Sequence, residues 1–112
     1  MASVNRLQLS SGAISGDTNG TAYTLEGLQL DFAGLLKISA LGAGTSLVVK
    51  IQTSPDNSNW IDWITFTTAT ATGGEVVRAT TFGMTYVRAK FDFTGGTETC
   101  TATVDLFYDK RR

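Results

Sequence analysis

The sequence has no histidine and only one cysteine, Cys100, and each shortage excludes a familiar kind of chemistry. Without histidine the chain has no Ser–His or Cys–His pair, no imidazole base and no histidine ligand for a metal. With one cysteine it forms no internal disulfide, which favours synthesis in a reducing compartment. The acid–base chemistry left to the chain is that of its carboxylates.

The chain also lacks long apolar runs and an excess of positive charge. No stretch approaches the roughly 20 apolar residues of a membrane-spanning helix, and the N-terminal MASVNRLQLSSGAISG lacks the features of a signal peptide. The net charge of −1 leaves no basic footprint for nucleic acid. At 112 residues we therefore expect one soluble domain that binds neither membranes nor nucleic acids.

The ten acidic residues would supply a catalytic pair only if two of them met at a fixed separation. Asp31, Asp92 and Asp105 instead fall at outward positions of expected strands, where an aspartate keeps a surface soluble. Residues 17–20 offer oxygen atoms but lack the spacing and the final glutamate of an EF-hand loop. We therefore expect no enzyme activity, no metal site and no cofactor, and we expect Cys100 to be a half-buried thiol.

What the chain has in abundance is alternation of apolar and polar residues, together with eighteen threonines. Period-two alternation is typical of antiparallel strands with one dry face and one wet face, and threonine suits the wet face. Turn signals rich in glycine separate the alternating segments. The expected strands are 4–9, 21–25, 28–32, 35–41, 46–53, 60–68, 75–80, 85–93 and 99–108.

This pattern predicts an all-β fold, a single antiparallel β-sandwich. A jelly roll is the first choice and an immunoglobulin-like sandwich the alternative, because both bury one face of each strand. We expect the sandwich to occupy residues 21–109. Residues 1–20, rich in serine and glycine, are expected to form a flexible N-terminal arm, and residues 110–112 a basic C-terminal tip.

Residues 53–63, TSPDNSNWIDW, form the most distinctive stretch and predict the turn of a β-hairpin. Alternation after the turn places Trp60 and Asp62 on the core face with Ile64, and Trp63 on the opposite, wet face. We therefore interpret Trp60 as a core residue. For Trp63 three roles stay open: an interface with a partner, which is favoured, packing under a loop, or stacking on a sugar.

The segments TSPDNSNW, TYVRAKFDF and TATVDLFY, with Gly-Gly turns at 73–74 and 95–96, follow one another between about residues 46 and 108. This succession resembles small virion proteins of tailed bacteriophages. The resemblance implies a compact β-sandwich that serves as a capsid decoration (cement) protein, or as a tail or neck component. A carbohydrate-binding module, in which Trp63 or Tyr86 stacks on a sugar, is the competing hypothesis.

The resemblance further implies a homotrimer on the outer capsid surface, synthesised in the host cytoplasm and bound to the major capsid protein. No small-molecule ligand is expected. Either sheet could face the partner, and the basic tip could contact an acidic neighbour or be a solvated tail. The candidate interface residues are Trp63, Tyr86, Arg88, Lys110, Arg111 and Arg112.

Overall fold

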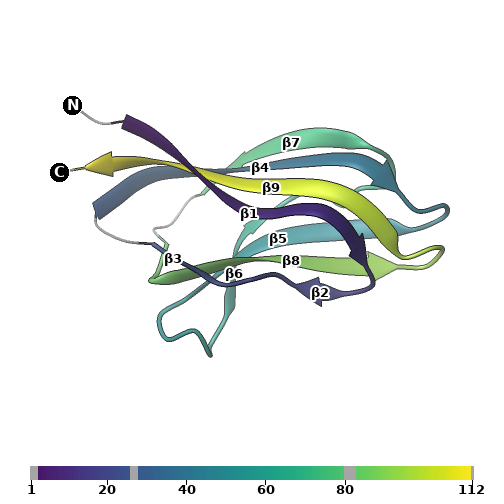
Figure 1. The fold of residues 1–112 in the computed structure, drawn as a ribbon, viewed down its shortest axis with the longest axis horizontal. Helices are drawn as coiled ribbons and strands as arrows, with labels where there is room; N and C mark the ends of the chain where they lie inside the picture. The colour runs from purple at the N-terminus through teal and green to yellow at the C-terminus, as the bar shows by residue number, and fades with distance from the viewer. Residues whose placement is uncertain (1–2, 26–27, 80–82, 112) are drawn as a thin grey trace.

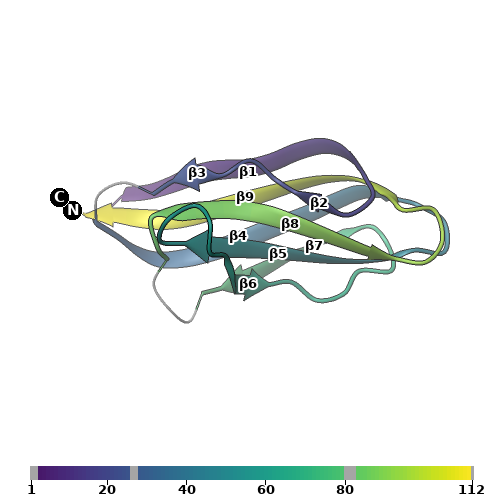
Figure 2. The ribbon, with the colours of Figure 1, turned by 90° about the horizontal axis from the view of Figure 1, so that it is seen from below.

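Two antiparallel sheets lie face to face in a computed structural model that describes residues 3–25, 28–79 and 83–111 (Figure 1). The first sheet has the order β1 (Ser3–Ser15), β9 (Thr99–Arg111), β4 (Leu28–Leu41) and β7 (Gly73–Arg78). The second sheet has β2 (Thr18–Asn19) and β3 (Tyr23–Thr24) against β8 (Tyr86–Thr94), followed by β5 (Ser46–Ser54) and β6 (Ile61–Thr65). Seen from below, the second sheet lies in front of the first (Figure 2).

The pairing of the strands is that of a jelly roll. With β2 and β3 taken as one interrupted strand, β1 pairs with β9, β2–β3 with β8, β4 with β7 and β5 with β6, all antiparallel. These nested pairs form when one long hairpin, with β5 and β6 at its tip, rolls up into two sheets. The all-β prediction and the preference for a jelly roll over an immunoglobulin-like sandwich are therefore confirmed.

The core between the sheets follows the predicted alternation. Along β5, Leu47, Val49 and Ile51 are fully buried, and along β8 Val87 and Phe91 are too. The residues between them point away from the core to the outer face of the second sheet. This division gives each sheet one face inside the sandwich and one outer face.

The expected strands 28–32 and 35–41 are one continuous strand, β4. The register between β4 and β9 shifts between Leu30 and Ala33, and Asp31 has a φ of 56°. This arrangement is a β-bulge, in which an extra residue bends a strand without ending its pairing. The interruption that the sequence indicated is therefore a bend within β4.

The expected flexible arm is the clearest correction to the predicted organisation. Ser3–Ser15 form β1, which pairs with β9 from Ser3 opposite Lys110 to Ser15 opposite Thr99. Leu9 is buried in the core, so this serine-rich segment is held by packing as well as by backbone pairing. At the other end, the backbones of Lys110 and Arg111 belong to β9, whereas Arg112 lies outside the described residues.

Candidate functional site

The turn between β5 and β6 is built around one carboxylate, that of Asp56. Its Oδ1 accepts hydrogen bonds from the backbone N–H groups of Ser58, at 2.9 Å, and Asn59, at 2.8 Å. These backbone donors, with the side chain of Asn59, lower the pKa of Asp56 to about 2. The predicted turn is therefore confirmed, and it holds the start of β6 in place.

The faces of β6 differ from the predicted ones because of a second bulge. Ile51 pairs with Ile64, but its neighbour Gln52 pairs with Asp62, so Trp63 is an extra residue on β6. An extra residue reverses the alternation on one side of the bulge. Ile64 stays in the core, but Asp62 lies on the outer face of the second sheet. The prediction that Asp62 shares the core face was wrong.

The same bulge exchanges the roles of the two tryptophans. Trp63 is half-buried against the core and meets Phe32 edge-on, with ring centroids 4.8 Å apart. A Cβ added at Gly83 would lie 2.8 Å from the Trp63 ring, so the ring occupies a tight site. Trp60 is only partly buried, and the guanidinium of Arg88 lies 4.2 Å from its ring centroid. The wet face predicted for Trp63 and the core position predicted for Trp60 were both wrong.

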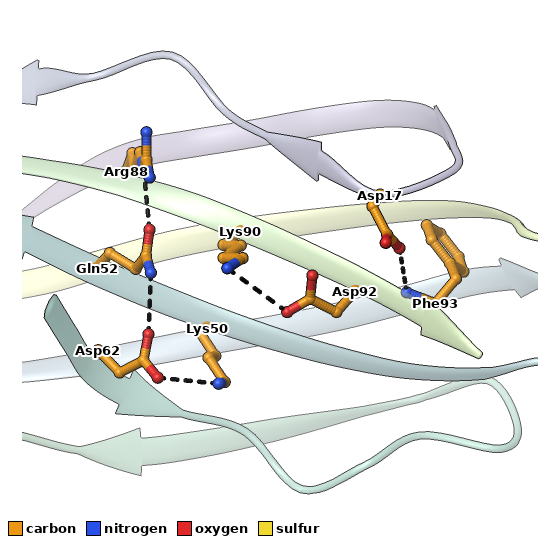
Figure 3. Close-up of polar contacts among 8 residues, drawn as sticks. All are labelled: Asp17, Lys50, Gln52, Asp62, Arg88, Lys90, Asp92 and Phe93. Atoms are coloured by element: carbon orange, nitrogen blue, oxygen red, sulfur yellow. Dashed lines mark hydrogen bonds and ion pairs between the residues drawn. The ribbon is translucent and has the colours of Figure 1, made fainter. Parts of the chain in front are cut away.

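A chain of hydrogen bonds crosses the outer face of the second sheet from β8 to β6 (Figure 3). Arg88 Nε donates to Gln52 Oε1, and Gln52 Nε2 donates to Asp62 Oδ1, each at 2.9 Å. Lys50 Nζ donates to Asp62 Oδ2, also at 2.9 Å. We call these four residues the polar network. Each charged group of the polar network therefore has a partner within the network at hydrogen-bond distance.

The polar network also sets the acidity of its members. Hydrogen bonds from Gln52 and Lys50 lower the pKa of Asp62, and the bond to Asp62 raises the pKa of Lys50. Burial lowers the pKa of Arg88. A carboxyl group that acts as a general acid needs a raised pKa, and the pKa of Asp62 is lowered instead.

The outer face of the first sheet is different in character. Strand register aligns two neighbouring rows of residues across β7, β4, β9 and β1, and we call these eight residues the row face. They are Val76, Leu35, Asp105 and Gln8 in one row, and Arg78, Ala33, Phe107 and Arg6 in the next.

Asp105 is the unusual member of the row face. Its side chain is only 7% exposed, and its Oδ1 has no hydrogen-bond partner. The nearest cation, Arg6, has its Nε 4.0 Å away, beyond hydrogen-bond distance. The prediction that Asp105 points outward is confirmed, but the solubilising exposed role that we expected was wrong.

Among the described residues, two hollows on the surface are lined mainly by aliphatic, threonine and glycine residues. One, of about 300 Å³, lies beside Leu36 and Ile38, and its rim includes Glu75, which accepts hydrogen bonds from the backbone and hydroxyl of Thr67. The other, of about 270 Å³, includes Cys100, whose thiol pKa is raised by burial. Within the described ranges no three residues of His, Cys, Asp and Glu cluster as metal ligands would.

The predicted interface residues whose side chains are described do not share one face. Tyr86 and Arg88 alternate with the buried Val87 and so share the outer face of the second sheet, whereas Trp63 packs on Phe32. The side chains of Lys110 and Arg111, and all of Arg112, lie outside the described residues. No helix in the described part of the chain is long and apolar enough to span a membrane.

Comparison with known proteins connects the chain to others through its fold alone. No family model matches the sequence, and no curated protein sequence does so either. Among solved structures, a chain of the T13 IBDV viral particle matches with a TM-score of 0.67 and 10% identity, over 98% of this chain and 31% of that one. PirA matches with a TM-score of 0.52 and 8% identity, over 94% of this chain and 92% of that one.

The fold is therefore a jelly roll that is similar to one part of a viral-particle protein. This chain spans about a third of the length of the viral-particle chain that it matches. Identities of 8% and 10% show a shared architecture alone. A proposal about function therefore has to be weighed against the surfaces as well as the fold.

Proposed function

We propose that this chain is a non-enzymatic structural protein of a virion, a decoration or cement protein on the capsid of a tailed bacteriophage. The observation that carries the proposal is the match of a viral-particle chain to 98% of this chain. The resemblance of residues 46–108 to phage virion proteins supports the same role. The partner we propose is the major capsid protein, with the chain as a homo-oligomer, a trimer, on the outer capsid surface.

The surfaces suit a protein that reinforces a particle by contact. The polar network ties three strands of the second sheet together through side chains, and Asp17 Oδ1 accepts a hydrogen bond from the Phe93 backbone at 2.7 Å, which joins the β1–β2 turn to β8. Such ties make the sheet stiff. Repeated on a symmetric oligomer, a modest contact surface gives high avidity for a repetitive lattice.

The competing hypothesis of a carbohydrate-binding module loses one of its two candidate residues. Trp63 was one of the two residues considered for stacking on a sugar ring, and it packs edge-on against Phe32 in a site closed by Gly83. Trp60 is the tryptophan on the outer side, but Arg88 covers one face of its ring. Of the residues considered for a sugar platform, only Tyr86 keeps an outward position, and one half-buried tyrosine is a small platform.

The test is the composition and strength of the particle. Heads purified from the virus that encodes this chain should contain it in fixed proportion to the major capsid protein, as measured by quantitative mass spectrometry. Heads made without it should break at lower temperature or milder osmotic shock, and the purified protein added back should restore their resistance. Finding the chain only in tails, or in no particle, would contradict the proposal.

A further inference from the structure

The row face combines exposed apolar surface with basic and acidic groups. Val76 is 67% exposed, and Leu35 lies next to it in the same row, half-buried. Val76 and Ile61 are the large hydrophobic residues exposed in the described part of the chain, and Ile61 belongs to the other sheet. The β7 edge of the row face therefore offers apolar contact area to a partner.

Asp105 has a buried carboxylate oxygen that finds no hydrogen-bond donor among the described residues. A carboxylate that is removed from water needs hydrogen-bond donors, because burial without them is costly. The neighbouring strands bury Asp105, yet they supply no donor to its Oδ1. Asp62 on the other sheet shows what a satisfied carboxylate looks like, with two donors at 2.9 Å.

The basic groups around Asp105 are exposed and loosely held. The Arg6 side chain is 58% exposed. The Arg78 side chain is 78% exposed, and its guanidinium lies 3.8 Å from Asp31, which is itself 57% exposed. Both ion pairs are longer than a hydrogen bond, so both guanidinium groups can turn to another carboxylate.

We propose that the row face is a self-association surface, in which a second copy of the chain covers Val76 and Leu35 and donates to Asp105 from a basic side chain. A patch of one sign would favour a partner of the opposite sign, but this face carries two arginines, Arg6 and Arg78, together with Asp105. It is therefore complementary to itself, as an isologous contact requires. An isologous contact joins two copies, so in the particle it would link neighbouring trimers, and the inference rests on the proposed function only for that place.

The first experiment is sedimentation velocity of the full chain from roughly 1 µM to 1 mM. The wild-type protein should associate as the concentration rises. Val76→Asp should weaken association at least about tenfold, because it places a charge in the apolar contact. The matched control is Ile61→Asp, which changes the other exposed aliphatic residue, at 52% exposure, and should associate like the wild type.

A second variant, Asp105→Asn, separates an interface role from a structural one. Removing a buried charge that has no hydrogen-bond donor and only a long ion pair with Arg6 should leave the melting temperature of the single chain unchanged or raise it. Association should weaken about thirtyfold, since the donor from the second copy loses its charged acceptor. A lower melting temperature with unchanged association would show that Asp105 serves only the fold and would overturn the inference.

Failure of this inference is distinguishable from failure of the capsid role. A wild-type chain that stays monomeric at every concentration but still binds purified heads overturns self-association and leaves the capsid role standing. A chain that associates through the row face but binds no heads supports self-association and contradicts the capsid role. Equal loss of association in Val76→Asp and Ile61→Asp would also overturn the row face as the specific surface.

Discussion

The outer faces of the two sheets come from the same alternating pattern, yet they differ in how their charges are satisfied. On the second sheet, Asp62 receives hydrogen bonds at 2.9 Å from Lys50 and Gln52. On the first sheet, Asp105 is more deeply buried and its nearest cation stands 4.0 Å away. The difference shows that cross-strand neighbours, more than residue type, decide whether a carboxylate finds hydrogen-bond donors within the chain.

The largest expected effect comes from truncating the two tryptophans. Trp63→Ala should lower the free energy of unfolding by about 3 kcal/mol, because the ring packs on Phe32 and the core edge. Trp60→Ala should cost about 1 kcal/mol, the size of its contact with Arg88. Urea unfolding of both variants measures the difference. The reverse order would restore the assignment that the sequence predicted and would remove the bulge at Trp63.

That reversal explains where prediction from sequence succeeded and where it did not. Alternation and turn signals are local, so the strands and the jelly roll could be predicted. The role of Trp63 could not, because a bulge is defined by the register with β5, and one extra residue changes the face of its neighbours. The burial of Asp105 depends on β1 and β4, which are distant in sequence. Likewise, the N-terminal segment could not be recognised as a strand of the sandwich, because it is held there by pairing with β9, at the other end of the chain.

The next effect compares two glutamines, one on each outer face. Gln52 is 6% exposed and bridges Arg88 to Asp62, so Gln52→Ala should cost about 2 kcal/mol of unfolding free energy. Gln8 is exposed beside Asp105, and Gln8→Ala should change stability by less than about 0.5 kcal/mol. Thermal and urea unfolding measure both. Equal losses of unfolding free energy in the two variants would mean that the two outer faces do not differ in how well their polar groups are hydrogen-bonded within the chain.

The acid limb of the stability curve gives a smaller and directional effect. Folding lowers the pKa values of Asp62 and Asp56, the latter to about 2, so both carboxylates stabilise the fold above the unfolded value near 3.9. That stabilisation is lost as the pH falls from about 4 toward the folded pKa values. Lys50→Met should raise the pKa of Asp62 and leave that of Asp56 unchanged. Carbon-detected NMR titration of the carboxyl groups measures both, and an unchanged Asp62 would remove Lys50 as a cause.

The smallest effect on the free energy of unfolding is expected at the long ion pairs. It tests whether the charges of the row face are only weakly held within the single chain. Arg78 and Asp31 are 3.8 Å apart and both are mostly exposed, so water screens their attraction. Arg78→Gln should therefore change the free energy of unfolding of the single chain by less than about 0.5 kcal/mol. Lys90→Gln, at the 4.0 Å pair with Asp92 on the second sheet, is the matched control. If Arg78→Gln destabilised the single chain by more than its control, Arg78 would already be engaged within the chain. The charged groups of the row face would then be paired within the chain, as those of the opposite face are, and the reason for a second copy to bind the row face would disappear.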